Sequence, residues 1–200
     1  MTITSKELTV VTPANHVPGP KQGCWTYDHY LALPDDGQRY EIVDGVLYMA
    51  PSPTPEHQNV VLWIAHYLLI HVKLTGLGQV YVAPVDVVLP PRTVVQPDVM
   101  VILKENLSKI KNKCVEGAPD LAVEIASPGT STHDRNRKYA AYARAGVSEY
   151  WIADPIAHTV EMLILEAGTY TSVGVFSGQD TLPSIVVPAI KAVHVEQFFA

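Results

Sequence analysis

Two carboxylates lie in segments of the sequence that are otherwise apolar. Asp98 precedes the run VMVIL, and Glu124 lies inside the run LAVEI. An unpaired carboxylate in such surroundings is costly, so it usually has a cation or hydrogen-bond donors as partners. Because side chains alternate along a strand, Glu124 shares a face with Ala126, and Asp98 shares a face with Met100. If the two segments are neighbouring strands, both carboxylates can bind one divalent cation, and oxygen ligands favour Mg²⁺ or Mn²⁺ over Zn²⁺.

Three further residues could complete a site for phosphodiester hydrolysis. Lys138 lies on the helix predicted after the Glu124 strand, where its charge could orient a water and offset developing negative charge. Glu41, near an Asp-Gly turn, is a candidate third carboxylate, and His57 is a candidate accessory base or ligand. Each residue alone has an ordinary alternative, such as an exposed hairpin residue, a solvated helix residue or an ion pair with arginine. The prediction therefore depends on the combination.

The elements that must position these residues begin with a hairpin and a long helix. The segment RYEIVDGVLYMA has Asp-Gly between two β-rich runs, which predicts a hairpin with a type I′ turn. Thr26 could cap a short helix, TYDHYLAL. Residues 55–74 predict a long helix with Thr54 as its N-cap. Apolar residues lie on almost every side of this helix, so we expect it to be buried on most sides.

The rest of the chain predicts strands around a second helix. The strands are expected at 79–89, 97–103, 119–126, 148–154, 158–165 and 169–175. The segment 127–129, Ser-Pro-Gly, breaks the chain, and a helix from about 134 to 145 ends at Gly146. The strand–helix–strand run 120–154 predicts a parallel, right-handed βαβ unit.

Together these elements predict an α/β fold with a mixed central sheet. The long helix and the βαβ crossover helix should flank this sheet. Residues 1–24 contain three prolines and are expected to form an extended N-terminal arm, and residues 25–200 a single domain.

Composition excludes several classes of protein. Of the 200 residues, 48% are hydrophobic and only 17% are charged, which is typical of a globular chain and not of a disordered one. Two cysteines are too few for a disulfide framework or a thiolate metal site, and we expect reduced thiols in the cytoplasm. The N-terminus lacks the apolar core of a signal peptide, and charged and histidine residues interrupt the long helix, so no membrane span is expected.

The order of Pro-Asp, a glutamate within an apolar strand and then a lysine resembles the PD-(D/E)xK restriction-endonuclease-like superfamily. More narrowly, the chain resembles the bacterial Uma-two (Uma2) family of that superfamily. The resemblance covers roughly residues 26–165. The matching stretches are YEIVDGVLYMAPSPTPEHQ, VVQPDVMVI and GAPDLAVEIASPGTSTHDRNRKYAAYARAGVSEYWIADP, together with the helix after His57.

This resemblance implies a restriction-endonuclease-like core and a metal-dependent endonuclease. The implied catalytic residues are Glu41, Asp98, Glu124 and Lys138, with His57 as an accessory residue. Asp98, Glu124 and Glu41 would hold Mg²⁺ or Mn²⁺. The implied partners are nucleic acid, with DNA as the expected substrate, and a second copy of the chain in a homodimer.

The chain departs from the superfamily pattern at one position. The lysine normally stands two residues after the acidic residue, where this chain has Ala126. The resemblance therefore requires the lysine to have moved to the following helix, where Lys138 can serve. The acidic residue of the first core helix is also displaced; Glu41 is the matching choice and Glu56 a weaker one.

Two other kinds of function remain open at this point. One is a catalytically degenerate module with a nuclease fold that binds nucleic acid or self-associates. The other, a metal hydrolase of small molecules, has little support because the sequence contains no HExxH, G-x-S-x-G or phosphate-binding glycine-rich motif.

The charge distribution decides how nucleic acid could bind. The formal net charge is −6, which argues against an indiscriminate nucleic-acid binder. Residues 104–144, however, hold eight of the fourteen basic residues and five acids, a local charge of +3. A basic rim around the carboxylates could therefore still bind a phosphate backbone.

Overall fold

The structure is a computed structural model that describes residues 11–50, 52–126 and 133–200. The first ten residues of the predicted N-terminal arm and the predicted break at 127–129 lie outside the described residues. Residues 11–24 form no helix or strand, but Pro13 bridges Tyr48 and the backbone of Ala14 donates to Leu47. The described part of the arm thus lies against the predicted hairpin.

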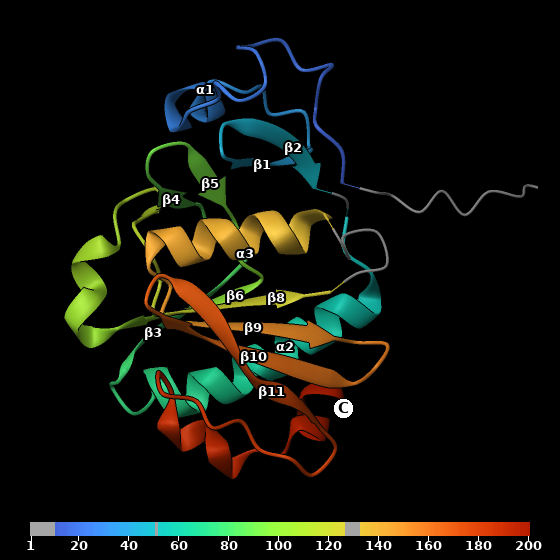
Figure 1. Ribbon diagram of the computed structural model, residues 1–200, viewed down its shortest axis with the longest axis vertical. Coiled ribbons are helices and arrows are strands. Elements are labelled where there is room, and N and C mark those ends of the chain that lie inside the picture. The colour runs from blue at the N-terminus through green and yellow to red at the C-terminus, as the bar shows by residue number, and fades with distance from the viewer. Residues whose placement is uncertain (1–10, 51, 127–132) are drawn as a thin grey trace, which may run out of the picture.

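A six-stranded mixed sheet forms the centre of the molecule (Figure 1). Its strands, in spatial order, are β11 (Thr169–Ser177), β10 (Thr159–Glu166), β9 (Glu149–Asp154), β8 (Leu121–Ile125), β6 (Val99–Leu103) and β3 (Gly78–Val82). Only β8 and β9 run parallel, and α3 (His133–Ala145) connects them. Gly146 ends this helix with a φ of 88°, which a glycine adopts without strain. The parallel pairing of the predicted βαβ unit is confirmed.

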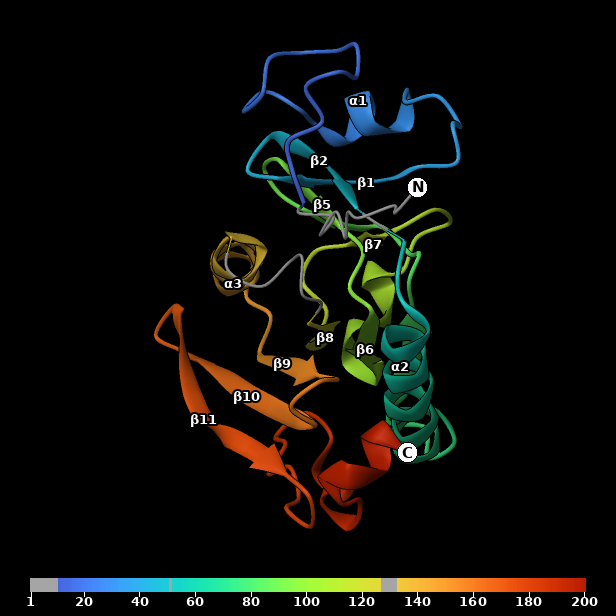
Figure 2. The same ribbon diagram turned by 90° about the vertical axis from the view of Figure 1, so that its right-hand side faces the viewer.

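Helix α2 (Pro55–Leu68) covers the face of this sheet opposite α3 (Figure 2). Its N-cap is Thr54, whose hydroxyl accepts a hydrogen bond from the backbone of His57. A π-helical turn, η1 (Leu69–Lys73), continues the helix, so the predicted span of 55–74 is nearly correct. The helix buries Val60, Ile64 and Leu68 against the sheet.

The expectation that this helix is buried on most sides is wrong. Leu62 is 65% exposed and Leu74 is 73% exposed, with Leu69 and Ile70 exposed between them. The sheet can cover only one stripe of a helix, and the other apolar stripe faces away from the core.

A second, five-stranded sheet lies beyond α3. Its strands, in spatial order, are β2 (Val46–Ala50), β1 (Arg39–Val43), β5 (Thr93–Val95), β4 (Val87–Leu89) and β7 (Val115–Glu116). Strands β1 and β2 form the predicted hairpin, and positive φ values of 52° at Asp44 and 77° at Gly45 confirm its type I′ turn. The short α1 (Tyr27–Leu31) precedes the hairpin and has the predicted N-cap, Thr26.

The single strand predicted at 79–89 is also wrong. The structure has β3 and β4 there, and the two strands belong to different sheets. The break falls at Ala83 and Pro84, because proline has no N–H to continue a strand ladder. The lysine-rich segment after β6 forms a 3₁₀ helix, η2 (Lys104–Lys109), and the chain ends in two more, η3 (Pro188–Ala192) and η4 (Val195–Phe199).

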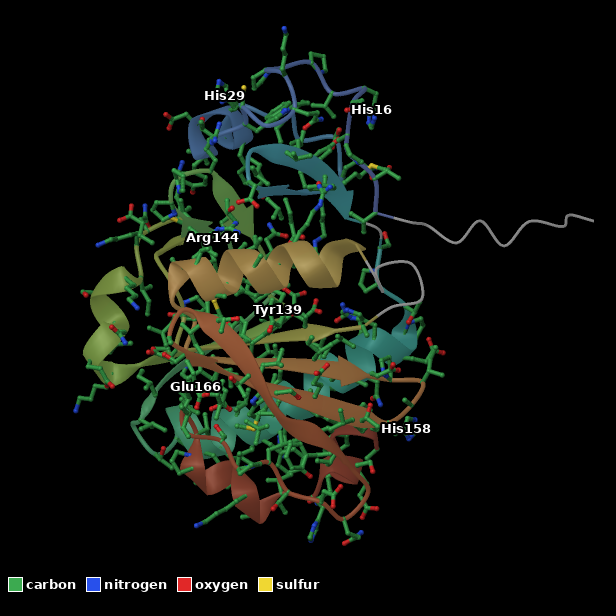
Figure 3. All side chains as sticks on the ribbon, viewed as in Figure 1. His16, His29, Tyr139, Arg144, His158 and Glu166 are labelled. Atoms are coloured by element: carbon green, nitrogen blue, oxygen red, sulfur yellow. The ribbon has the colours of Figure 1, made fainter. Side chains whose placement is uncertain are left out.

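Helix α3 lies between the two sheets and contacts both. Arg144 forms an ion pair with Asp44 of the hairpin turn, and the Tyr139 hydroxyl donates to the backbone oxygen of Tyr170 on β11. Figure 3 shows Arg144 and Tyr139 on opposite sides of the helix, each toward one sheet. Any side chain on the buried faces of α3 is therefore enclosed by residues from distant parts of the chain.

No helix in the described ranges has the length and apolar character needed to cross a membrane. Cys24 is exposed and Cys114 is buried, and both are free thiols.

Candidate active site

The four residues predicted to form a catalytic set come together where α3 crosses between the sheets. The ammonium group of Lys138 lies 2.9 Å from Oε2 of Glu41 and 3.1 Å from Oε1 of Glu124. The side chains of these three residues are 11–16% exposed. Lys138 therefore bridges two carboxylates that come from different sheets.

Backbone and side-chain donors fix the two carboxylates that Lys138 contacts. Glu41 on β1 accepts a hydrogen bond from the backbone N–H of Gln96 at 2.8 Å. Glu124 on β8 accepts one from the hydroxyl of Tyr142 at 2.6 Å. Lys138 and Tyr142 are four residues apart on α3, so they lie on the same face of the helix. One helical face thus supplies two partners of Glu124.

Asp98 lies beside this cluster, as the sequence predicts. Strands β6 and β8 are antiparallel neighbours with Val99 opposite Val123, so the register continues to Asp98 opposite Glu124. Oδ2 of Asp98 accepts a hydrogen bond from the backbone N–H of Ile125 at 2.8 Å. The condition that the two strands be neighbours is therefore met.

His57 contacts Asp98 from α2, on the far side of the central sheet from α3. Its Nε2 lies 3.2 Å from Oδ2 of Asp98. Its Nδ1 is buried, and it has no hydrogen-bond partner among the residues that the structure describes. When Nε2 carries the proton that Asp98 accepts, Nδ1 has a free lone pair that can take a proton or bind a cation.

The enclosure of the cluster changes the proton affinities of its groups. Burial raises the pKa of Glu124 to about 8; Lys138 opposes this shift, and the carboxylates of Asp98 and Glu41 add to it. Burial alone would lower the pKa of Lys138, but the carboxylates of Glu124 and Glu41 raise it well above its ordinary value. Lys138 thus keeps its positive charge. The carboxylates of Glu124, Glu41 and Asp98 all interact with this charge.

The donor atoms of the cluster fit a hard divalent cation. Three carboxylates and one ammonium carry a net formal charge of −2 when all are ionised, and carboxylate oxygens are the ligands that Mg²⁺ prefers. Among the residues that the structure describes, no three His, Cys, Asp or Glu side chains already stand around a common point as a metal cage. In the described geometry Lys138 is the cation that Glu41 and Glu124 share.

In the structure the glutamate of the motif, Glu124, has its lysine contact from helix α3 and not from its own strand. Ala126 follows Glu124 by two residues at the end of β8, and its methyl group cannot reach a carboxylate. The helix-borne Lys138 contacts Glu124 instead. Glu56, the weaker candidate for the displaced acidic residue, is exposed at the start of α2, whereas Glu41 is in the cluster.

Sequence reasoning missed two residues of the cluster, Tyr142 and Gln96. The signal for Tyr142 was its spacing of four residues from Lys138 on a helix. The contribution of Gln96 to Glu41 is a backbone N–H, which every residue except proline has, so its side-chain type gave no signal.

Comparisons with known proteins agree with this architecture. The chain is similar to a solved structure of a "putative nuclease belonging to DUF820" from Anabaena variabilis, with a TM-score of 0.71 and 20% sequence identity over 87% of this chain and 97% of that one. No curated protein matches the chain. The model of the family Uma2, described as "Putative restriction endonuclease", matches residues 27–194. The chain therefore has a nuclease fold and belongs to the Uma2 family.

Proposed function

We propose that the protein is a metal-dependent endonuclease that hydrolyses phosphodiester bonds of DNA. The observation that carries this proposal is the cluster in which Lys138 bridges Glu41 and Glu124 beside Asp98. A cluster of this kind supplies both parts of the chemistry, because its carboxylates can hold a cation and its ammonium can offset charge on a pentavalent phosphate.

Asp98, Glu124 and Glu41 would hold the Mg²⁺ or Mn²⁺ ion. A bound ion supplies Lewis-acid activation of the phosphate and of a water. The raised pKa of Glu124 supports this assignment, since burial and two neighbouring carboxylates create an excess of negative charge that a divalent cation would neutralise. Tyr142 orients the Glu124 carboxylate through its hydroxyl.

His57 would act beside the carboxylates as the accessory residue. Its buried Nδ1 can accept a proton while Nε2 keeps its contact with Asp98. Lys138 stays an ammonium because its pKa is raised, so it serves as a fixed positive charge and not as the base.

A nicking assay on supercoiled plasmid DNA tests the proposal. The wild type should cleave with Mg²⁺ or Mn²⁺ and not with chelator. Asp98→Asn and Glu124→Gln should each lower the rate at least about 100-fold, because each removes a ligand charge. The matched controls are Asp35→Asn and Glu166→Gln, which change exposed carboxylates and should cleave like the wild type.

Two results would overturn this assignment: cleavage that persists in both site variants, or a folded wild type that binds Mn²⁺ and cleaves neither DNA nor RNA. Thermal unfolding of each variant shows that a lost activity is not a lost fold.

The second candidate is a degenerate nuclease-fold module that binds nucleic acid or self-associates. The observation that favours it is the closed network in which Glu41 and Glu124 already have Lys138 as a partner. Titration calorimetry with Mn²⁺ separates the two candidates. A folded protein that binds DNA and shows no heat of Mn²⁺ binding at pH 8 is the module and not the enzyme.

We also propose that the chain forms a homodimer through the exposed stripe of α2 and η1. This stripe consists of Leu62, Leu69, Ile70 and Leu74. A two-fold axis places the same patch against itself, so one apolar stripe is sufficient for an interface.

We place the protein in the cytoplasm, where two free thiols stay reduced.

A further inference from the structure

A pocket of about 480 Å³ lies near the candidate active site, and its lining includes none of the proposed catalytic residues. It opens between α1, the link from β3 to β4 and the loop before β7. The lining residues that matter here are Tyr30, Tyr81, Asp86, Gln96, Lys111 and Lys113. This volume lies within the usual range of small-molecule sites.

The pocket is on the same face of the central sheet as the carboxylates. Tyr81 of β3 pairs with Met100 of β6, which pairs with Ala122 of β8. Paired residues share a face, and Glu124 follows Ala122 by two residues, so Tyr81 and Glu124 lie on that same face. The pocket and the cluster therefore lie on the same side of the central sheet.

The polar wall of the pocket is a preformed hydrogen-bond network around Asp86. Its Oδ1 accepts hydrogen bonds from the Tyr30 hydroxyl and from Nε2 of Gln96, each at 2.9 Å. The Nε and Nη2 atoms of Arg39 each donate a hydrogen bond of 3.2 Å to Oε1 of Gln96, which fixes the orientation of that amide. Burial and the Asp86 carboxylate raise the pKa of Tyr30, so its hydroxyl remains a donor. Both donors occupy Oδ1 of Asp86. No residue in the described ranges donates to Oδ2, which can therefore accept hydrogen bonds from a ligand.

Gln96 joins this wall to the active site. Its side chain is part of the pocket, and its backbone N–H donates to Glu41 at 2.8 Å. The outer edge of the pocket carries the exposed Lys111 and Lys113. The pocket thus combines aromatic rings, one carboxylate oxygen able to accept and two ammonium groups at the opening.

We propose that this pocket binds one nucleobase of the nucleic-acid substrate, with guanine preferred. The base would stack on Tyr81 and donate N–H groups of its Watson–Crick edge to Oδ2 of Asp86. Its phosphate would lie against Lys111 and Lys113. Aromatic rings bind any base by stacking, whereas a carboxylate selects bases with adjacent N–H donors, and guanine has two.

This inference rests on the proposed function, because it identifies the substrate class as a polynucleotide whose base leaves the stack. Binding of a base in a pocket next to the chemistry also gives the enzyme a way to choose its cleavage position.

Titration calorimetry with dGMP, dAMP, dCMP and dTMP on the metal-free protein tests the pocket. We expect dGMP to bind best, and Asp86→Asn to weaken dGMP at least about tenfold, because the asparagine amide places donors against the donors of the base. Lys111→Gln with Lys113→Gln should weaken all four nucleotides to a similar extent. The matched control, Lys191→Gln, changes an exposed lysine near the C-terminus and should bind like the wild type.

The pocket assignment is overturned if none of the four nucleotides binds to the wild type, or if folded Asp86→Asn keeps the wild-type affinity and preference. If Asp86→Asn does not fold, the exposed double-lysine variant decides, and unchanged affinity in that variant overturns the assignment. The outcome is separate from that of the nuclease proposal. A protein that nicks DNA and binds no nucleotide retains only the nuclease, and one that binds dGMP through Asp86 and cleaves nothing retains only the pocket.

Discussion

The surroundings of Glu124 raise its pKa above that of an exposed glutamate. Burial is the main cause, and the carboxylates of Asp98 and Glu41 contribute, so that its pKa rises from an ordinary 4.5 to about 8. In the metal-free protein this residue therefore links folding and cation binding to pH.

The first prediction concerns stability and pH. Between pH 4.5 and about 8 Glu124 is protonated in the folded protein and ionised in the unfolded chain. The free energy of unfolding therefore contains a contribution from Glu124 that is complete below pH 4.5 and is lost as the pH rises to about 8. The free energy of unfolding should fall relative to that of Glu124→Gln by up to about 1.4 kcal/mol per pH unit. Urea unfolding at pH 5 to 8 without metal measures both curves.

Titrating groups far from the cluster cancel in this comparison because they are common to both proteins. Glu166→Gln, at an exposed position, should follow the wild-type curve. Parallel curves for the wild type and Glu124→Gln would show that Glu124 ionises normally in the fold.

Glu149 is another buried carboxylate, and it lies outside the cluster around Lys138. It is 0% exposed and accepts hydrogen bonds from the indole N–H of Trp151 and from the backbone N–H groups of Ile185 and Val186. It thereby ties the C-terminal segment to β9.

The second prediction is that Glu149→Gln lowers the free energy of unfolding by about 2–4 kcal/mol. The glutamine amide nitrogen must face at least one of these donors, which leaves a buried N–H without an acceptor. Thermal or urea unfolding measures the loss. Glu166→Gln, the exposed counterpart, should change stability by less than about 0.5 kcal/mol. A Glu149→Gln protein as stable as the wild type would contradict the tethering role.

At the scale of elements, the position of the lysine depends on how α3 crosses the end of β8. Lys138 reaches Glu124 from the helix, and Ala126 occupies the strand position where the superfamily pattern has the lysine. Whether a lysine at the strand position can replace one on the helix is open to a direct test.

The third prediction is a transfer of the lysine. Lys138→Ala should lower the nicking rate at least about 100-fold, because a fixed positive charge is lost at the phosphate. Adding Ala126→Lys to this variant should raise its nicking rate at least about tenfold, because alternation places residue 126 on the face of Glu124. Initial rates at saturating Mg²⁺ measure the effect.

A lysine added elsewhere controls for net charge. Ala157→Lys, at an exposed turn, should restore nothing in the Lys138→Ala background. If Ala126→Lys gives no recovery in a folded protein with wild-type metal affinity, the two positions are not equivalent.

The whole molecule combines two sheets around α3, with one apolar stripe left exposed on α2. The stripe spans Leu62 to Leu74, and its end residues are 65% and 73% exposed. Contiguous exposed apolar patches are typical of surfaces that bind another protein.

The fourth prediction is that the wild type sediments with twice the 21.9 kDa mass of the chain at micromolar concentration. Leu62→Glu with Leu74→Glu should weaken association at least about tenfold, because two charges would be buried at the interface. Ile156→Glu, at another exposed apolar position, should remain dimeric. Sedimentation equilibrium measures all three proteins, and a monomeric wild type would contradict the proposed interface.

Local patterns predicted much of the fold because their causes are local. The Asp44–Gly45 turn follows from the positive φ values that these two residues tolerate, and the end of α3 follows from Gly146. The division of 79–89 between two sheets was not predicted, since an alternating pattern looks the same in either sheet. The exposed stripe of α2 was also missed, because an apolar residue does not reveal whether its partner lies in the same chain.

The sequence by itself determined the chemical types at the site and the strand face on which each carboxylate lies. Alternation alone puts Glu124 on the face of Ala126. That the strands of Asp98 and Glu124 are neighbours was a condition of the prediction, and the structure meets it. Only the tertiary structure decided that Lys138 contacts Glu41, a residue 97 positions away. It also decided that Glu41 accepts a second hydrogen bond, from the backbone N–H of Gln96. The physical reason is that periodicity reports the direction of a side chain, whereas the partner it meets depends on how sheets and helices far apart in the sequence pack together.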